Sequence, residues 1–192
     1  MKKDLVQESE NYKKIADELL ADSEILSQLQ NYGVVETTGS YAYNLMLAPD
    51  IDIVVNSKPN NKEKAIRLLN QLIDNDWWNL FTFADWYQEK FRISKWQWLP
   101  KGYYIRVKAD YNGYRWNIDI WLVDNLEYQK RKDFDTEMSK IDSRQKKIIL
   151  NLKNVRNQEK LNISSVDIYE AVTKHNIATI DDLNNWVAKE KV

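Results

Sequence analysis

The stretch that decides the fold, residues 33–55, reads GVVETTGSYAYNLMLAPDIDIVV. An apolar run leads into Gly39-Ser40, nine residues follow, and the triplet Asp50-Ile51-Asp52 opens a second run of β-branched residues. β-Branched residues favour strands, so we predict strands at 34–38 and 51–56. Glycine permits the sharp turn needed after the first strand, and we expect a short helix at about 41–47 before the second strand begins.

Asp50 and Asp52 are two positions apart on the second predicted strand. Side chains alternate between the faces of a strand, so the two carboxylates share one face while Ile51 and Ile53 point into the core. Their Cα atoms would lie about 6.6 Å apart. Two ionised carboxylates at this spacing repel each other, which indicates a divalent cation between them.

A third acidic residue, Asp119, lies in the apolar segment Trp116-Asn-Ile-Asp-Ile-Trp-Leu-Val123. We predict strands at 103–109 and 114–123, because Asn-Gly in the connection Asp110-Tyr-Asn-Gly113 is a strong hairpin signal. If the apolar faces of both strands point into the core, Arg106, Lys108 and Asp119 share the opposite face. A solvated strand face is the alternative for the two cations. It suits Asp119 poorly, because isoleucine flanks that residue on both sides.

The whole pattern resembles the nucleotidyltransferase superfamily typified by DNA polymerase β, in particular its small stand-alone and antibiotic-modifying members. The resemblance covers roughly residues 33–124 and rests on an apolar strand, Gly-Ser, the spacer, Asp-x-Asp and a later strand with one central acid. It implies an α+β fold with a mixed β-sheet flanked by helices.

The resemblance also implies roles for site residues. Asp50, Asp52 and Asp119 would be the catalytic residues and would bind Mg²⁺, with two ions expected. Gly39 and Ser40 would hold the β- and γ-phosphates of a nucleoside triphosphate, with added charge from Arg106 or Lys108. A simple strand-to-helix turn with Ser40 as N-cap is the alternative for the Gly-Ser pair.

Tyr43 and Asn44, which follow the Gly39-Ser40 turn, differ from the residues of many relatives, which have a basic residue or a glycine at these positions. Asn44 can adopt the left-handed conformation that glycine would provide. Tyr43 cannot replace a cation, so part of the phosphate charge must be met from elsewhere.

Composition narrows the classes of function. The chain has 192 residues, a formal net charge of −1, no cysteine and one histidine, His175. Without cysteine, thiol nucleophiles and thiolate zinc sites are excluded. The absence of a basic excess argues against a protein that grips long nucleic acid. No segment approaches the roughly 20 apolar residues of a membrane span. The polar N-terminus does not resemble a secretory signal, so we expect a cytoplasmic location.

These observations predict an enzyme that moves a nucleoside monophosphate from an NTP, with ATP as the first candidate, to a hydroxyl of a small-molecule acceptor, with release of pyrophosphate. Modification of a protein or an RNA, as in toxin–antitoxin nucleotidyltransferases, is an alternative. A non-catalytic nucleotide-binding module is another, which the full set of three carboxylates disfavours. The resemblance also leaves a homodimer open.

The remaining segments predict helices around the sheet. Helical spacing marks 3–31, with a break at Asp22-Ser23 and Ser23 as N-cap, and also 62–74. The aromatic segment 76–99 is hard to interpret beyond a predicted strand at 91–96. Helical spacing returns from about 127 and continues across 135–158, and capping boxes at Ser164 and Thr179 predict two further helices. We therefore expect a nucleotidyltransferase domain at 1–126 and a C-terminal helical region at 127–192.

Overall fold

A five-stranded mixed sheet forms the centre of the computed structural model, which describes residues 4–88 and 99–190. The strand order is β1-β2-β5-β4-β3. The central strand, β5, is parallel to its neighbour β2, and every other neighbouring pair is antiparallel. The strands are β1 (Val34–Thr38), β2 (Asp50–Asn56), β3 (Leu80–Asp85), β4 (Gly102–Tyr111) and β5 (Tyr114–Val123).

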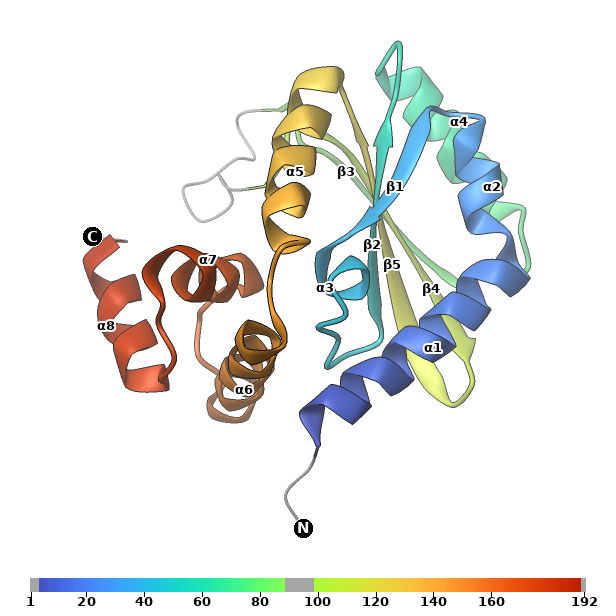
Figure 1. Cartoon of the computed structure of the whole chain (residues 1–192). Helices are drawn as coiled ribbons and strands as arrows, with labels where there is room; N and C mark the ends of the chain where they lie inside the picture. The colour runs from blue at the N-terminus through green and yellow to red at the C-terminus, as the bar shows by residue number, and fades with distance from the viewer. Residues whose placement is uncertain (1–3, 89–98, 191–192) are drawn as a thin grey trace.

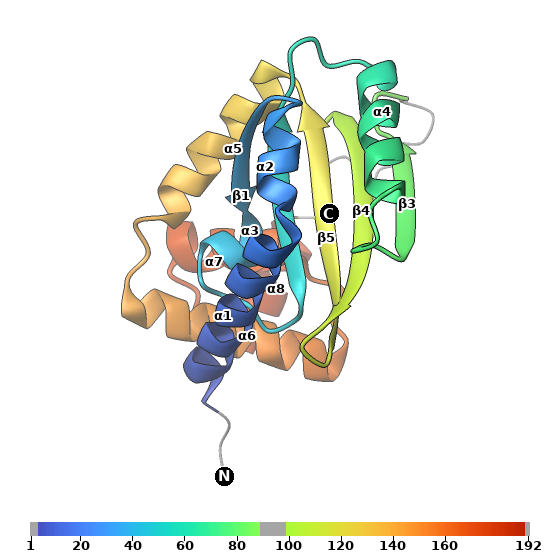
Figure 2. The ribbon, with the colours of Figure 1, turned by 90° about the vertical axis from the view of Figure 1, so that its right-hand side faces the viewer.

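The helices lie on the two sides of this sheet, as Figures 1 and 2 show together. Those of the N-terminal part are α1 (Leu5–Ser23), α2 (Ile25–Gln30), the short α3 (Gly39–Ala42) and α4 (Lys62–Ile73). Those of the C-terminal part are α5 (Asn125–Met138), α6 (Ser143–Glu159), α7 (Ser165–His175) and α8 (Ile180–Glu190).

One face of the sheet is the apolar core, which α1, α2 and α4 cover. Ile51 and Ile53 of β2 and Ile118 and Ile120 of β5 are fully buried there, as predicted from their alternation. The opposite face therefore carries the polar residues of β2, β4 and β5. Towards the C-terminal ends of β2 and β5 this polar face is covered by α5, where Tyr128 packs with the side chains of Val54, Trp121 and Val123.

A second apolar cluster joins the C-terminal helices to the segment that follows Gly39-Ser40. Tyr43 and Leu45 pack there with residues of α6 and α7, including Leu150 and Tyr169. The segment between β1 and β2 is thus fixed from the C-terminal side of the chain. The division into regions 1–126 and 127–192 stays a prediction.

Most predicted elements are confirmed, and several details are corrected. The break in the first helix is present, but Ser23 ends α1, and Glu24 occupies the N-cap position of α2 with a left-handed backbone and no side-chain cap. The helical spacing at 135–158 belongs to two helices, because Asp142 opens α6 with a capping box. β3 was not predicted, and α3 is shorter than expected. The predicted strand at 91–96 lies outside the described residues.

The turn predictions after Gly39-Ser40 and at the hairpin hold. Asn44 adopts a φ of 57°, and the hairpin residues Asn112 and Gly113 have φ values of 48° and 78°. The predicted capping box at the start of α7 is present, between Ser164 and Asp167. At α8 one half of the predicted box is shown: the Thr179 hydroxyl accepts from the Asp182 N–H at 3.2 Å, and it donates to the Asp182 carboxylate at 2.7 Å. Within the described ranges, no helix is both long enough and apolar enough to cross a membrane.

We predict that Trp116→Ala lowers the free energy of unfolding by about 3–5 kcal/mol, because it empties a large volume in the core. Trp116 is fully buried, and its indole N–H donates to the Tyr111 carbonyl at 3.2 Å. Urea denaturation would measure the change. Tyr114→Ala is the control, since that ring is 41% exposed. Equal losses in the two variants would contradict this account of the core.

Candidate active site

The parallel pairing of β2 with β5 brings the three predicted acids together. In the register of this pair, Asp52 lies opposite Asp119 and Asp50 lies opposite Asn117. Each of the three aspartates offers one carboxylate oxygen, and these oxygens lie within 4.8 Å of one another. The juxtaposition that the sequence predicted is therefore present in the fold.

The crowding of these acids has an electrostatic cost. Burial disfavours the charged form of Asp50, and the negative charge of Asp119 adds to this, so the pKa of Asp50 rises to about 6. Burial and the charges of Asp50 and Asp119 together raise the pKa of Asp52 to about 7. Both carboxylates thus lie in a place where positive charge would be strongly favoured.

Of the three acids, Asp119 is the one for which the described part of the chain shows an ion pair. The Arg106 guanidinium donates to both oxygens of Asp119, from Nε at 2.5 Å and from Nη2 at 2.7 Å. The Tyr104 hydroxyl donates to Asp119 Oδ1 at 3.0 Å. A carboxylate has about four lone-pair sites, so one site, on Oδ2, is left for a further ligand.

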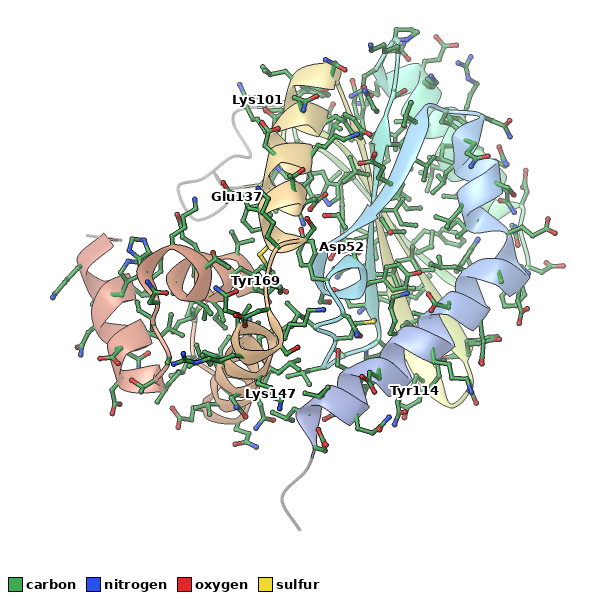
Figure 3. All side chains as sticks on the ribbon, in the orientation of Figure 1. Asp52, Lys101, Tyr114, Glu137, Lys147 and Tyr169 are labelled. Atoms are coloured by element: carbon green, nitrogen blue, oxygen red, sulfur yellow. The ribbon has the colours of Figure 1, made fainter. Side chains whose placement is uncertain are left out.

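The Gly39-Ser40 turn lies directly against Asp52. Gly39 has a φ of 68°, and a Cβ at this position would lie 2.1 Å from Asp52 Oδ2. Only glycine fits here, both because of the left-handed backbone and because the carboxylate occupies the space. Figure 3 shows Asp52 beside α3, on the side of the sheet where the C-terminal helices lie. The predicted phosphate-binding turn and the acids are therefore one site.

Lys153 of α6 is a site residue that sequence reasoning missed. It is 4% exposed, and its Nζ donates to the Leu45 carbonyl at 2.6 Å and to the Tyr169 hydroxyl at 3.3 Å. Burial lowers its pKa to about 7, although the charges of Asp52 and Asp50 act in the opposite direction. The sequence did carry a signal for its burial: Lys153 follows Ile149 by four residues and Leu150 by three, so it shares the apolar face of α6.

The other predicted residues occupy different places. Lys108 lies opposite Asn117 in the β4–β5 register, so it shares the polar face with the acids. Among the described residues, the structure shows no hydrogen bond from Lys108 to any of the three acids. Arg106 is also on this face, but it is bound to Asp119. Asp110 and Asp124 are structural, as expected: Asp110 pairs with Arg115, and Asp124 caps α5.

The donor set fits a divalent metal ion. Carboxylate oxygens are the ligands that Mg²⁺ prefers. Buried Asp50 Oδ1 accepts no hydrogen bond from the part of the chain that the structure describes. Asp52 and Oδ2 of Asp119 complete the set, and a cation bound between the acids would relieve the repulsion that raises the pKa values of Asp50 and Asp52.

Comparison with solved structures identifies the fold. The chain is similar to the structure titled "Structural Basis for the Activity of a Cytoplasmic RNA Terminal U-transferase", with a TM-score of 0.56 and 16% identity over 85% of this chain and 46% of that chain. It is also similar to the polymerase core of TRAMP, an RNA surveillance complex, with a TM-score of 0.55 and 16% identity over 83% of this chain and 48% of the other.

A third similar structure is the poly(A) polymerase complex GLD-2–GLD-3, with a TM-score of 0.56 and 11% identity over 88% of this chain and 57% of that chain. The chain thus spans about half the length of these three structures. A comparison with protein-family models found no match, and one with curated protein sequences found no significant match. On this sheet topology and these similarities, the chain has the polymerase-β-like nucleotidyltransferase fold.

Proposed function

We propose that the protein is a metal-dependent nucleotidyltransferase, which moves a nucleoside monophosphate from an NTP to an acceptor hydroxyl. The observation that carries the proposal is the cluster of Asp50, Asp52 and Asp119, whose oxygens lie within 4.8 Å of one another. A protein that only binds nucleotides has no need to bring three mutually repelling acids together at one point. The reaction forms a bond between the acceptor oxygen and the α-phosphorus, and the bond to the β-phosphate breaks to release pyrophosphate.

Asp50 and Asp52 would hold Mg²⁺, two ions being expected, and Asp119 would join them through Oδ2. Bound cations of this kind neutralise charge on the transferring phosphate and lower the pKa of the attacking hydroxyl. Asp119 would also orient the acceptor hydroxyl, and to accept its proton this carboxylate would have to release one of its hydrogen bonds from Arg106 or Tyr104, since Oδ2 has a single open site. Arg106 and Tyr104 hold the Asp119 carboxylate in place for that task.

The nucleotide would lie on the Asp52 side of the cluster. Gly39 permits close approach of the backbone there, and Ser40 offers a hydroxyl. Lys153 reaches this segment from α6 through the Leu45 carbonyl, so its ammonium group would offset part of the phosphate charge. Arg106 and Lys108 belong to β4, which lies on the other side of the acid cluster from the Gly39-Ser40 turn. To contact the phosphates of the nucleotide as well, Arg106 would have to give up part of its hydrogen bonding to Asp119.

The acceptor is the second half of the proposal. The net charge of −1 and the aromatic-rich segment 76–99 favour a small-molecule acceptor. A second candidate, the 3′ end of an RNA, is favoured by the similar structures, which include an RNA terminal U-transferase and poly(A) polymerases. The U-transferase among them also makes UTP an alternative to ATP as the nucleotide.

One assay separates these candidates. The protein is incubated with Mg²⁺ and each α-labelled NTP, alone, with a short RNA, with the same RNA blocked at its 3′ hydroxyl, and with a pool of hydroxylated small molecules. Label transfer to RNA that the 3′ block abolishes supports the RNA acceptor, and transfer to a small molecule supports the first candidate. Metal-independent nucleotide binding without pyrophosphate release would contradict the enzymatic proposal.

We predict that Asp52→Asn lowers the rate of transfer by at least about 10³-fold, because the amide keeps the volume and removes the charge that binds the metal. Pyrophosphate release at saturating NTP would measure the loss. Asp110→Asn is the matched control, since Asp110 lies in the exposed hairpin and pairs with Arg115. Retained activity in the Asp52 variant would remove this residue from the site.

The pKa shifts predict how stability depends on pH in a chelator. Asp50 and Asp52 have pKa values of about 6 and about 7 in the folded protein, against an ordinary 3.8. The folded state then binds more protons than the unfolded chain between about pH 4 and pH 7, so the free energy of unfolding falls as pH rises through this window. With a pKa of about 7, Lys153 is mostly protonated in both states there.

In Asp52→Asn, this fall should shrink by on the order of 2 kcal/mol, because one of the two titrating groups is gone. Urea denaturation in EDTA at pH 4.5, 5.5 and 6.5 would measure the change. Mg²⁺ should stabilise the wild type most at the upper end of this range, where fewer protons compete with the ion for the two carboxylates. Parallel pH profiles for the two proteins would contradict the crowding of the acids.

A further inference from the structure

We propose that Arg131 and Asp135 of α5 form a clamp that positions the Gly39-Ser40 turn for the phosphates of the nucleotide. The inference rests on the proposed function and adds two positioning residues to it. Both lie about ninety residues along the chain from the turn. The clamp consists of Arg131, Asp135 and the two residues that they hold, Thr38 and Tyr43.

The clamp holds both ends of the turn. On its N-terminal side, Thr38 Oγ1 donates to Asp135 Oδ1 at 2.7 Å and accepts from Arg131 Nε at 2.6 Å. On its C-terminal side, the Tyr43 hydroxyl donates to the same Asp135 oxygen and accepts from Arg131 Nη2 at 3.0 Å. The residues between them, including Gly39 and Ser40, therefore span two points that are fixed by one pair of charged side chains.

The orientation of Thr38 supports a positioning role. Thr38 occupies the N-cap position of α3, where a threonine commonly uses its hydroxyl to cap the helix. Here it makes no side-chain cap, and the hydroxyl points to α5. Thr38 is also 3% exposed, so its hydroxyl must find a protein partner. The fold thus uses this buried hydroxyl to join the turn to α5 and not to complete the local helix.

The charges of the clamp bear on the phosphate charge that Tyr43, which is not a cation, cannot offset. Arg131 and Asp135 form an ion pair at 3.2 Å, with side chains that are 30% and 22% exposed. The positive charge of Arg131 also opposes the rise in the pKa of Asp52. The cation that the turn lacks in sequence is therefore supplied by α5, across the hydroxyl of Tyr43.

A partly buried ion pair is weak evidence for stability, because desolvation offsets much of the attraction. The four hydrogen bonds of this pair with Thr38 and Tyr43 instead fix the geometry of the turn. Nucleotide phosphates bind the turn both before and during the reaction. Loosening the turn should therefore weaken nucleotide binding and raise KM more than it lowers kcat.

The test compares Thr38→Val with Thr38→Ser. Valine keeps the shape and removes the hydroxyl, whereas serine keeps it. We expect Thr38→Val to raise the KM for Mg–NTP about 10-fold or more, since hydrogen bonds to charged groups are lost, with kcat changed less than about 3-fold. Thr38→Ser should stay near the wild type. Should Thr38→Val fold poorly, Tyr43→Phe tests the clamp from its other end.

Two further variants complete the experiment. Arg131→Gln should also raise KM. The double variant Arg131→Gln with Thr38→Val should raise KM by less than the two single effects combined, because both substitutions remove the same contact. Arg115→Gln is the control: it breaks an ion pair with Asp110 at the hairpin and should leave KM unchanged.

The outcomes separate the two proposals. A wild type that turns over NTP, with an unchanged KM in Thr38→Val and Tyr43→Phe, would overturn the clamp alone. Loss of thermal stability and kcat together, with KM constant, would also overturn it, because that is the behaviour of a purely structural contact. A wild type that neither binds nor turns over Mg–NTP would overturn the proposed function and the clamp with it.

Discussion

The parallel pairing of β2 with β5 is the constraint on which the rest of the structure depends. Neighbouring strands lie about 4.8 Å apart, so a register that sets Asp52 opposite Asp119 forces their carboxylates together. Asp50, two residues earlier on the same face, joins them. The apolar faces of these strands cannot be satisfied in a register shifted by one residue, since every isoleucine would then turn away from the core.

This pairing costs electrostatic energy, and the surrounding residues limit that cost unequally. Arg106 and Tyr104 satisfy most of Asp119, whereas Asp50 keeps an oxygen with no partner among the described residues. Lys153 and Arg131 approach Asp52 from two separate helices, and both act against the rise in its pKa. The site is therefore arranged around a negative charge that the protein leaves incompletely neutralised, which is the condition for binding cations.

The C-terminal helices complete this site. Apolar contacts from α6 and α7 fix Tyr43 and Leu45, while α5 holds Thr38 and Tyr43 through charged hydrogen bonds. The turn that would hold the nucleotide is thus short in sequence but is supported from a distant part of the chain. A nucleotide bound at this turn would be in contact, through it, with three helices.

The amino-acid sequence by itself determined β1, β2, β4 and β5, the face to which each acid belongs and the sharp turn at Gly39. These follow from local rules: the period of two along a strand and the backbone freedom of glycine. Local rules also explain the errors. Residues 135–158 were predicted as one helical segment, although α5 ends at Met138 and α6 begins at Ser143. Both helices pack on the same apolar cluster, so the spacing of their apolar residues continues across the break between them. β3 escaped notice, because its aromatic residues suit a core in either conformation.

Only the tertiary structure decided which charges meet. Lys153 is a buried cation in an apolar stripe, and its neighbours, Leu45 and Tyr169, come from elsewhere in the chain. Arg106 could have faced solvent or a phosphate, and the β4–β5 register set it opposite Asp119. Arg131 and Asp135 look like an ordinary i, i+4 helix pair until the packing of α5 brings Thr38 between them. Partners of this kind depend on helix packing angles, which no local pattern records.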